Sequence, residues 1–233
     1  MTNFFAPDIK KSSKDTALNV VEEFCSIQGE SSYTGRLCYF IRLAGCNLSC
    51  SYCDTLYAKK ANDGKITTID EILQRVLKSK FQTVEITGGE PLLQTKPVIE
   101  LCKKLLEHDI TVLIETNGSI SIKNIPEDVV KIIDIKTPSS NEGKSFNINN
   151  VDYLAKHDQI KFVIGSSADY DFAVSYIKKY SLADKVNELL FSPMWTKVEP
   201  SQIVEWLVKD NIKNCRIQLQ IHKIIWHPDE QGV

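Results

Sequence analysis

The chain has 233 residues, of which 42% are hydrophobic and 25% charged, and its formal net charge is −2. These values are ordinary for a globular protein with one substantial core, and they give no sign of a nucleic-acid-binding surface. No apolar run approaches the roughly 18 residues that a membrane span requires, and residues 1–19 lack the apolar segment of a secretory signal. We therefore expect one domain over residues 1–233, with residues 1–18 as an N-terminal extension.

Apolar and β-branched runs predict a series of strands, most of them separated by segments with helical periodicity. In chain order the predicted strands are 19–27, 38–45, 83–89, 111–118, 129–136, 159–165, 188–194 and 216–222. The first predicted helix has four apolar residues on one face and begins at a capping box formed by Thr68 and Glu71. Further helical patterns follow around residues 99–106, 172–177 and 203–207.

Strands that alternate with helices predict a parallel sheet covered by helices, because parallel strands need crossover connections. The expected fold class is α/β, a partial (β/α)6-type TIM barrel. Unusual polar segments follow the predicted strands at their carboxyl ends, the rim where barrel enzymes build their sites. These segments are the loop after strand 38–45 and residues 88–91, 115–118, 134–138, 192–195 and 220–222.

Cys46, Cys50 and Cys53 are spaced C-x3-C-x2-C in the loop after strand 38–45. Thiolates bind soft metals, so this loop is a candidate site for zinc or for an iron–sulfur cluster. A structural zinc site is closed by four protein ligands, and no fourth cysteine or histidine lies nearby in the sequence. A cubane held by three cysteines leaves one iron open for an external ligand, so the pattern favours a catalytic cluster.

The seven cysteines are an odd number in a chain too long to be a disulfide-stapled scaffold. The expected location is therefore the reducing cytoplasm. Four cysteines outside the motif lie in apolar or strand-like surroundings and are expected to be small buried residues. They are Cys25, Cys38, Cys102 and Cys215.

The cysteine spacing in a βα loop resembles the signature of the radical S-adenosylmethionine (SAM) enzymes. This resemblance implies a [4Fe-4S] cluster whose open iron binds the methionine part of SAM, and one-electron cleavage of SAM to a 5′-deoxyadenosyl radical. The segment "GGEP", residues 88–91, lies one βα unit later and resembles the part of that superfamily that meets the methionine amino group. Its two glycines permit a close approach of the backbone.

The segments "SIQGE" (26–30), "FIRLAGCN" (40–47) and "CDT" (53–55) together resemble the 7-carboxy-7-deazaguanine synthases. The resemblance continues to the ending "QIHKIIWHPDEQGV" and spans most of residues 20–233. It implies a lyase that converts 6-carboxy-5,6,7,8-tetrahydropterin to 7-carboxy-7-deazaguanine with loss of ammonia, a step of queuosine biosynthesis. It also implies Mg²⁺, an electron donor of the flavodoxin or ferredoxin type and a homodimer; no nucleic acid or membrane partner is expected.

The same resemblance implies the roles of individual residues, none of them as an acid or base. Expected substrate contacts are Ile27, Gln28, Gly29, Glu30, Arg42, Thr87, Glu115, His222 and Pro228. Expected SAM contacts are Tyr52, Cys53, Asp54, Gly89, Glu90, Asp134, Ile135, Lys136, Ser192, Pro193, Met194 and Trp195. The expected metal ligands are Cys46, Cys50 and Cys53 for the cluster and Thr55 for Mg²⁺.

Physical chemistry leaves an alternative for three of these residues. The planar fork of Arg42 suits a substrate carboxylate, and a structural ion pair is the alternative. The hydroxyl of Thr55 suits a hard cation, and the alternative is a turn cap after Asp54. His222 could equally be an incidental residue of a barrel-closing strand.

Two segments depart from the synthase pattern. Ser31 replaces the glycine that usually follows "QGE", and "DIKTPSS" stands where many members have an "SPK"-like segment. A strand end of the "DLK" type is more typical of glycyl-radical activating enzymes, so that class is the first alternative function. A non-catalytic, zinc-stabilised binding protein is the second. The polar run 139–145 is expected to be a solvated loop, with a lid as the alternative.

Overall fold

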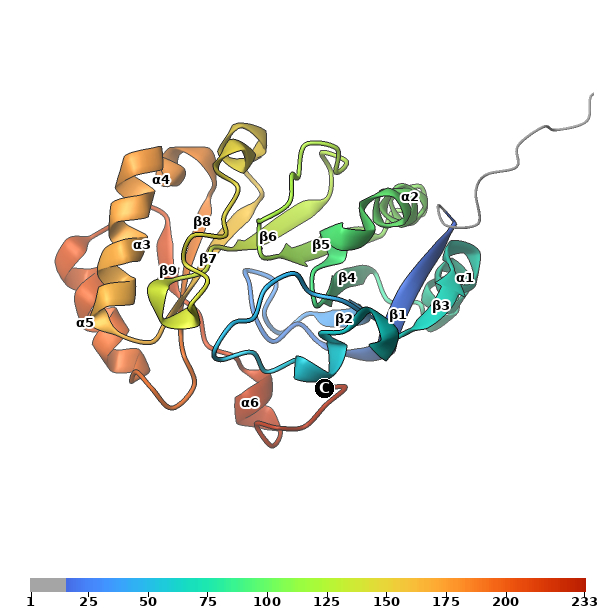
Figure 1. The fold of residues 1–233 in the computed structure, drawn as a ribbon, viewed down its shortest axis with the longest axis horizontal. Coiled ribbons are helices and arrows are strands. Elements are labelled where there is room, and N and C mark those ends of the chain that lie inside the picture. The colour runs from blue at the N-terminus through green and yellow to red at the C-terminus, as the bar shows by residue number, and fades with distance from the viewer. Residues whose placement is uncertain (1–15) are drawn as a thin grey trace, which may run out of the picture.

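A computed structural model describes residues 16–233 as a twisted sheet with helices along its outer side (Figure 1). The strand order is β3-β1-β2-β4-β5-β6-β7-β8-β9. The strands are β1 (Ala17–Ile27), β2 (Leu37–Leu43), β3 (Lys65–Thr68), β4 (Thr83–Gly88), β5 (Thr111–Thr116), β6 (Val130–Asp134), β7 (Gln159–Ile164), β8 (Glu188–Pro193) and β9 (Cys215–Ile217). Neighbours from β2 to β9 are parallel, whereas β1 is antiparallel to both β2 and β3.

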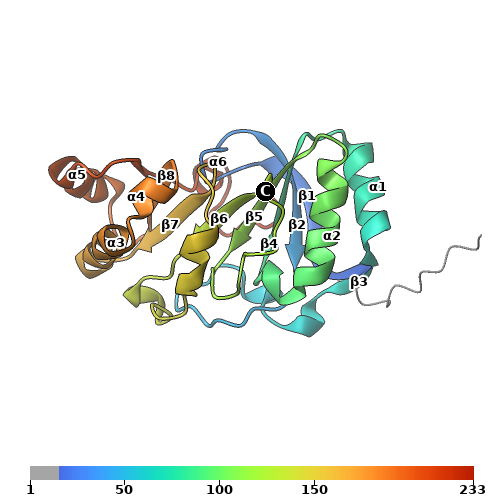
Figure 2. The same ribbon diagram turned by 90° about the horizontal axis from the view of Figure 1, so that it is seen from above.

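Except for the short α6 (His222–Ile225), the helices lie toward the two ends of this sheet (Figure 2). The helices are α1 (Ile69–Ser79), α2 (Thr95–Leu106), α3 (Ser167–Tyr180), α4 (Leu182–Lys185), α5 (Pro200–Asp210) and α6 (His222–Ile225). Helix α2 packs on β5, α3 on β7, and α5 on β8 and β9. The predicted capping box begins α1: the Thr68 side chain accepts from the Glu71 N–H, and the Glu71 carboxylate accepts from the Thr68 N–H.

The sheet does not close on itself, since β3 and β9 are its edges in the described residues. This open parallel arrangement confirms the predicted partial barrel. The short edge strand β3 was not predicted. Nor does an α-helix connect β5 to β6 or β6 to β7 within residues 16–233, where loops and the 3₁₀ helices Pro138–Ser140 and Ile148–Tyr153 are found instead.

The prediction of a strand over 216–222 is wrong in its second half. Strand β9 ends at Ile217, and His222 begins α6. The chain leaves the sheet after β9 because its backbone forms a hydrogen bond with the loop after β1. The Ile221 N–H donates to the Gly29 carbonyl at 3.0 Å. His222 is therefore not part of a barrel-closing strand.

Alternation along the strands separates apolar from charged side chains. Ile86, Ile114 and Ile133 belong to the hydrophobic core shared with the helices. Their strand neighbours Glu85, Glu115 and Asp134 therefore point to the opposite, concave face. The inner face of this open barrel is consequently rich in ionisable groups, which is the setting of a site rather than of a packed core.

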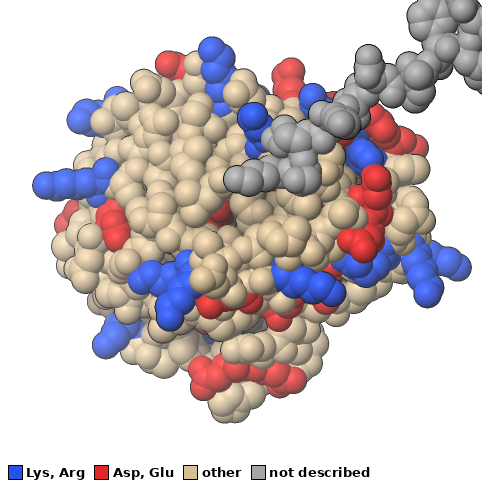
Figure 3. Space-filling view, turned by 45° about the vertical axis from the view of Figure 1, so that its right-hand side comes forward, with Lys and Arg blue, Asp and Glu red and all other residues tan. Residues whose placement is uncertain are grey.

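Figure 3 shows acidic and basic side chains interspersed on the face that it presents. No helix in the described part of the chain is long and apolar enough to cross a membrane. Residues 1–15 of the expected N-terminal extension lie outside the described residues, and β1 begins at Ala17.

Candidate active site

The three cysteines of the motif line one pocket at the carboxyl end of β2. Its other lining residues are Leu48, Ser49, Thr55, Lys59, Gly88 and Gly89. Burial raises the pKa of the Cys46 and Cys50 thiols, so metal binding there has to displace protons. Within residues 16–233, no group of three or more His, Cys, Asp or Glu side chains is placed to hold a single metal ion. Three thiols spread around a pocket fit a multi-iron cluster better than a closed zinc site.

Both glycines of "GGEP" are required by the cysteine loop. The Gly89 N–H donates to the Leu43 carbonyl at 3.0 Å, and the Glu90 N–H donates to the Gly45 carbonyl at 2.7 Å. A Cβ atom on Gly89 would lie 2.1 Å from the Gly45 oxygen, and one on Gly88 would lie 2.2 Å from the Leu43 oxygen. The backbone after β4 therefore fixes the chain directly before Cys46.

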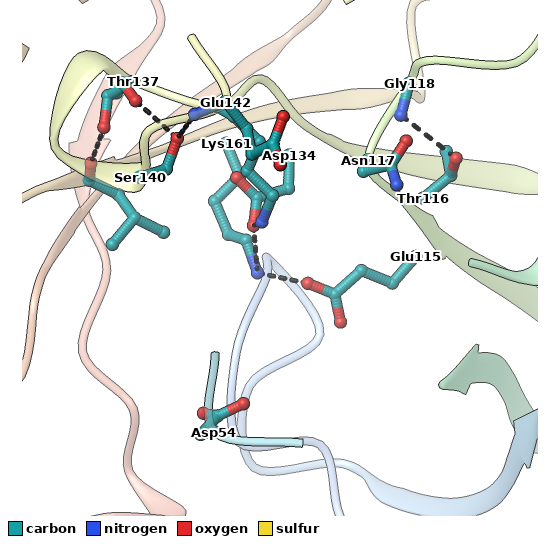
Figure 4. A network of polar contacts seen from close by, with 12 residues as sticks. Asp54, Glu115, Thr116, Asn117, Gly118, Asp134, Thr137, Ser140, Glu142 and Lys161 are labelled. Atoms are coloured by element: carbon teal, nitrogen blue, oxygen red, sulfur yellow. Dashed lines mark hydrogen bonds and ion pairs between the residues drawn. The ribbon is translucent and has the colours of Figure 1, made fainter. Parts of the chain in front are cut away.

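The Glu90 side chain joins two rim loops. Its fully buried carboxylate accepts from the Leu92 N–H at 2.9 Å, from the Asn117 N–H at 2.8 Å and from the Thr116 hydroxyl at 2.8 Å. Figure 4 shows Thr116, the last residue of β5, and Asn117 side by side. The carboxylate thus holds the loops after β4 and β5 together, and the expected contact of Glu90 with SAM stays a prediction.

The polar run 139–145 fastens the cysteine loop from the other side. The Ser51 N–H donates to the Ser140 carbonyl at 3.0 Å, and the Ser51 hydroxyl donates to the Ser139 carbonyl at 2.6 Å. The Glu142 carboxylate accepts from the Ser49 N–H at 2.7 Å. Ser140 is buried. The expectation of a solvated loop is therefore wrong for this contact, which pairs segments about ninety residues apart in the chain.

Among residues 16–233, two buried polar atoms beside the cysteine loop meet no hydrogen-bond partner: Oδ1 of Asp134 and the Tyr52 hydroxyl. The other Asp134 oxygen accepts from Lys136 Nζ at 2.6 Å, and Lys136 Nζ lies 5.8 Å from the centroid of the Tyr52 ring. Because buried polar groups are normally satisfied, such orphaned atoms are the kind that a bound polar cofactor would complete. This donor and acceptor set fits the SAM contacts expected of these residues.

The remaining expected SAM contacts lie along neighbouring strand ends. Ile135 and Ser192 are buried after β6 and within β8. The Met194 N–H donates to the Ile164 carbonyl of β7 at 2.8 Å. Trp195 is exposed, with Lys223 Nζ 6.0 Å from its ring centroid. Ile135 follows β6, and Ser192 to Trp195 lie at or after the end of β8, so the structure brings this group to the carboxyl ends of the strands.

A second group of charges lies on the concave face, centred on Lys161 of β7 (Figure 4). Lys161 Nζ lies 2.8 Å from the Glu30 carboxylate, contacts Glu115 of β5, and lies 3.7 Å from Asp134 of β6. Burial alone would lower the pKa of the Lys161 ammonium, but the three carboxylates raise it well above its ordinary value. Lys161 was not predicted as a site residue, because a single lysine in an apolar strand gives no signal of its own.

Gln28 and Glu85 lie beside these charges. The Gln28 amide donates to the Glu85 carboxylate and accepts from the Glu30 N–H at 3.0 Å. Burial, followed by repulsion from Glu115 and Glu30, raises the pKa of Glu85 to about 8. Thr87, two residues further along β4, donates to Glu115 at 3.4 Å. The structure thus brings together four of the predicted substrate contacts, Gln28, Glu30, Thr87 and Glu115. Their binding of a substrate stays a prediction.

Ser31, the departure from the family pattern, adopts the left-handed conformation with φ 64°. That region favours glycine, which explains why glycine is usual there. Here the Ser31 N–H donates to the Gln218 side chain at 2.9 Å, and the Ser31 hydroxyl accepts from the Tyr33 N–H at 3.1 Å. The loop after β1 therefore keeps a glycine-like turn with a serine in it.

Arg42 of β2 is engaged in a structural ion pair. Its Nε donates to the Glu22 carboxylate at 2.7 Å, and its guanidinium lies 5.8 Å from the ring centroids of Phe24 and Tyr57. This contact does not use the two terminal nitrogens of the guanidinium. The predicted contact with a substrate carboxylate therefore remains compatible with the ion pair.

Thr55 and Pro228 lack a structural sign of their expected roles. The Thr55 hydroxyl donates to Asp54 at 2.8 Å, the turn contact expected as its alternative, and Asp54 also pairs with Lys223 at 3.2 Å. Pro228 follows α6 and is half-buried. Ile27 lines a different groove, together with Trp226 and Val233, so the structure does not bring its side chain to Lys161.

Gly29 and His222 lie in direct contact, although 193 positions separate them by number. A Cβ atom on Gly29 would lie 2.0 Å from His222 Nδ1. Burial lowers the pKa of His222, which favours its neutral imidazole. The structure thus brings these two predicted substrate contacts together.

This contact predicts the result of a glycine substitution. Gly29→Ala should lower the free energy of unfolding by about 1–3 kcal/mol, because the added methyl group overlaps the imidazole ring. Thermal unfolding would measure the loss. The double variant Gly29→Ala/His222→Ala removes the ring and should regain most of that stability; an equally unstable double variant would show that the clash is not the cause.

Known proteins similar to this chain define the class of protein to which it belongs. The sequence pattern of the radical SAM superfamily matches residues 40–207. The crystal structure of QueE from Escherichia coli has the same fold, with a TM-score of 0.73 and 19% identity over 91% of this chain and 99% of that one. The chain belongs to the radical SAM superfamily, and a [4Fe-4S] cluster and SAM are therefore its cofactors.

Relatives define the family within that class. A 7-carboxy-7-deazaguanine synthase from Koribacter versatilis (strain Ellin345) is 43% identical over 229 residues, covering 93% of this chain and 100% of the relative. One from Chlorobaculum tepidum is 42% identical over 224 residues, covering 95% of this chain and 100% of the relative. The chain belongs to the 7-carboxy-7-deazaguanine synthase family.

Proposed function

We propose that this chain converts 6-carboxy-5,6,7,8-tetrahydropterin to 7-carboxy-7-deazaguanine with loss of ammonia, as a carbon–nitrogen lyase of queuosine and 7-deazaguanine biosynthesis. The observation that carries the proposal is the pair of carboxylates of Glu30 and Glu115, held by Lys161 on the concave face. Asn117, two residues after Glu115, donates to Asn47 of the cysteine loop at 3.2 Å. Glu115 therefore lies close to the cysteine loop.

The substrate matches these groups. A tetrahydropterin presents ring N–H and amino donors along one edge, and ionised carboxylates accept such donors strongly. Glu30 and Glu115 would accept from that edge, and Gln28, Gly29 and Thr87 line the same space. Neutral His222 would form its wall, with Pro228 and the main chain of Ile27 beside it. The terminal nitrogens of Arg42 would bind the carboxylate at the opposite end.

The cofactor residues follow the rim. Cys46, Cys50 and Cys53 would hold the cluster. When bound, the cluster and SAM would supply a 5′-deoxyadenosyl radical for hydrogen-atom abstraction at C6 of the pterin. The chain's own part is to hold C6 close to the 5′ carbon, because a misplaced radical reacts elsewhere. The residues assigned to SAM are Tyr52, Cys53, Asp54, Gly89, Glu90, Asp134, Ile135, Lys136, Ser192, Pro193, Met194 and Trp195.

Four further features belong to the proposal. Thr55 would ligate Mg²⁺, whose other ligands would be substrate and water oxygens. An electron donor of the flavodoxin or ferredoxin type would reduce the cluster. The working form would be a cytoplasmic homodimer. All seven cysteines are free thiols, as three of them must be to bind iron. One domain, residues 1–233, would carry the whole reaction.

Turnover of the candidate substrate tests the proposal. The full chain, reconstituted anaerobically with iron and sulfide, should form 7-carboxy-7-deazaguanine from the carboxypterin when SAM and a strong reductant are present. SAM cleavage without this product would instead support a glycyl-radical activating enzyme. Isolation with zinc and without iron or sulfide would support the zinc-stabilised binding protein.

Arg42→Ala gives a narrower prediction. Loss of the guanidinium should raise the KM for the carboxypterin roughly 10- to 100-fold, as expected for a charge-assisted contact, while uncoupled SAM cleavage continues. Arg75→Ala is the matched control, because Arg75 pairs with Glu23 on the outer side of the same hairpin at 2.5 Å. Equal KM values for the Arg42 and Arg75 variants would refute the assigned role.

A further inference from the structure

We propose that Lys161 is the positioning residue of the substrate pocket: it fixes the Glu30 and Glu115 carboxylates at one spacing and keeps both available as hydrogen-bond acceptors. This inference rests on the proposed function and deepens it. Lys161 itself touches the two carboxylates rather than the reacting atoms. Nothing in its sequence context, an apolar strand, assigns it this role.

The contacts of Lys161 gather three separate elements. Its ammonium is buried and reaches Glu30 in the loop after β1 at 2.8 Å, contacts Glu115 at the end of β5, and faces Asp134 at the end of β6 at 3.7 Å. Lysine is suited to this place, since its compact ammonium has three donors that can point to three acceptors. One side chain therefore sets the separation of groups that the chain supplies from distant positions.

Each carboxylate also accepts hydrogen bonds from side chains other than Lys161. Glu30 accepts from the Gln218 amide at 3.0 Å and from the Gln220 amide at 2.7 Å. Glu115 accepts from the Thr87 hydroxyl at 3.4 Å. With Lys161 between them, neither carboxylate is free to rotate. This is the preorganisation that a precise hydrogen-bonding edge requires.

Charge explains why the lysine is needed. Glu30, Glu115 and Asp134 would otherwise face one another in a buried space, and like charges in such a space drive protonation. A protonated carboxyl donates a hydrogen bond where the pterin edge needs an acceptor. Glu85, which does not contact Lys161 directly, shows this effect: burial and the neighbouring carboxylates raise its pKa to about 8. Burial alone would raise the pKa of Glu30 in the same way, but Lys161 holds the pKa of that carboxyl below its ordinary value.

The test is the binding of the carboxypterin to the anaerobic holoenzyme in the presence of SAM. Lys161→Met should raise the Kd roughly 10- to 100-fold, the loss of one charge-assisted hydrogen-bonding partner. Lys161→Arg keeps the charge but not the compact geometry, and should bind about 3- to 10-fold more weakly than wild type.

Lys131→Met is the control. Lys131 is also a buried lysine paired with a buried aspartate, Asp158 at 3.1 Å, but it lies near the opposite end of β6. This variant should lose stability and keep the wild-type Kd. A purely structural role of Lys161 would give the two methionine variants the same Kd.

The outcomes separate this inference from the proposed function. A wild-type holoenzyme that forms no product defeats the proposed function. Normal wild-type turnover with an unchanged Kd in Lys161→Met defeats only the role of Lys161. Should Lys161→Met show no cooperative unfolding, Lys161→Arg decides alone: weakened binding supports the inference, and wild-type binding overturns it.

Discussion

Cys50→Ala is expected to abolish both product formation and reductive cleavage of SAM, a loss of at least about 1,000-fold, because a cubane cannot be held in this loop by two thiolates. The cysteine lines the pocket together with Cys46 and Cys53. Iron and sulfide content after anaerobic reconstitution should fall with activity. Stability should change little, since the Cys50 side chain is partly exposed and belongs to the rim rather than the core.

Cys25→Ala is the matched control for that experiment. Cys25 lies in β1 outside the motif, and the expectation that it is buried is wrong, because the residue is exposed. Its replacement should leave iron content and turnover at the wild-type level. A Cys50 variant with wild-type iron content, or a Cys25 variant that loses its iron, would contradict the assignment of the three ligands.

Gly89→Ala is expected to have a large effect although it alters no functional group. The new Cβ atom would lie 2.1 Å from the Gly45 carbonyl oxygen and 3.0 Å from Cys46 Cβ. Because the obstacle is backbone, the cysteine loop has to move, at a cost of about 3 kcal/mol or more. Cluster content and the free energy of unfolding should therefore fall together.

Gly232→Ala provides the comparison. A Cβ atom there would meet nothing within 4 Å, although the residue has φ 74°. Backbone strain alone should cost about 1 kcal/mol, with cluster content unchanged. If Gly89→Ala reconstituted as well as Gly232→Ala, the close approach of the two loops would not be what holds Cys46 in place.

The residues at the carboxyl ends of the strands could be predicted from the sequence, because the patterns that indicate them lie within short segments of the chain. Cys46, Cys50 and Cys53 are recognisable from their spacing, and the carboxyl ends of parallel strands necessarily meet at one edge. The capping box of Thr68 and Glu71 likewise depends on four neighbouring residues. Each of these features could be predicted before any tertiary contact was known.

Lys161 and Glu142 could not be predicted, for a physical reason. Their functions come from pairing between distant segments: Lys161 meets Glu30 across 131 positions, and Glu142 meets the Ser49 N–H across 93. Whether a charged residue in a strand faces solvent or the barrel interior depends on the order of strands in the sheet. The course of the chain after Ile217 depends in the same way on contacts of Gln218, Gln220 and Ile221 with the loop after β1.

One isotope experiment tests the central claim, that a pterin bound at Glu30 and Glu115 reacts with SAM bound at the cysteine loop. The reconstituted chain is incubated with SAM, reductant and carboxypterin that carries deuterium at C6. We predict 7-carboxy-7-deazaguanine as product, with deuterium appearing in the recovered SAM. Cleavage of SAM with all of the deuterium retained by the unreacted pterin would contradict the account.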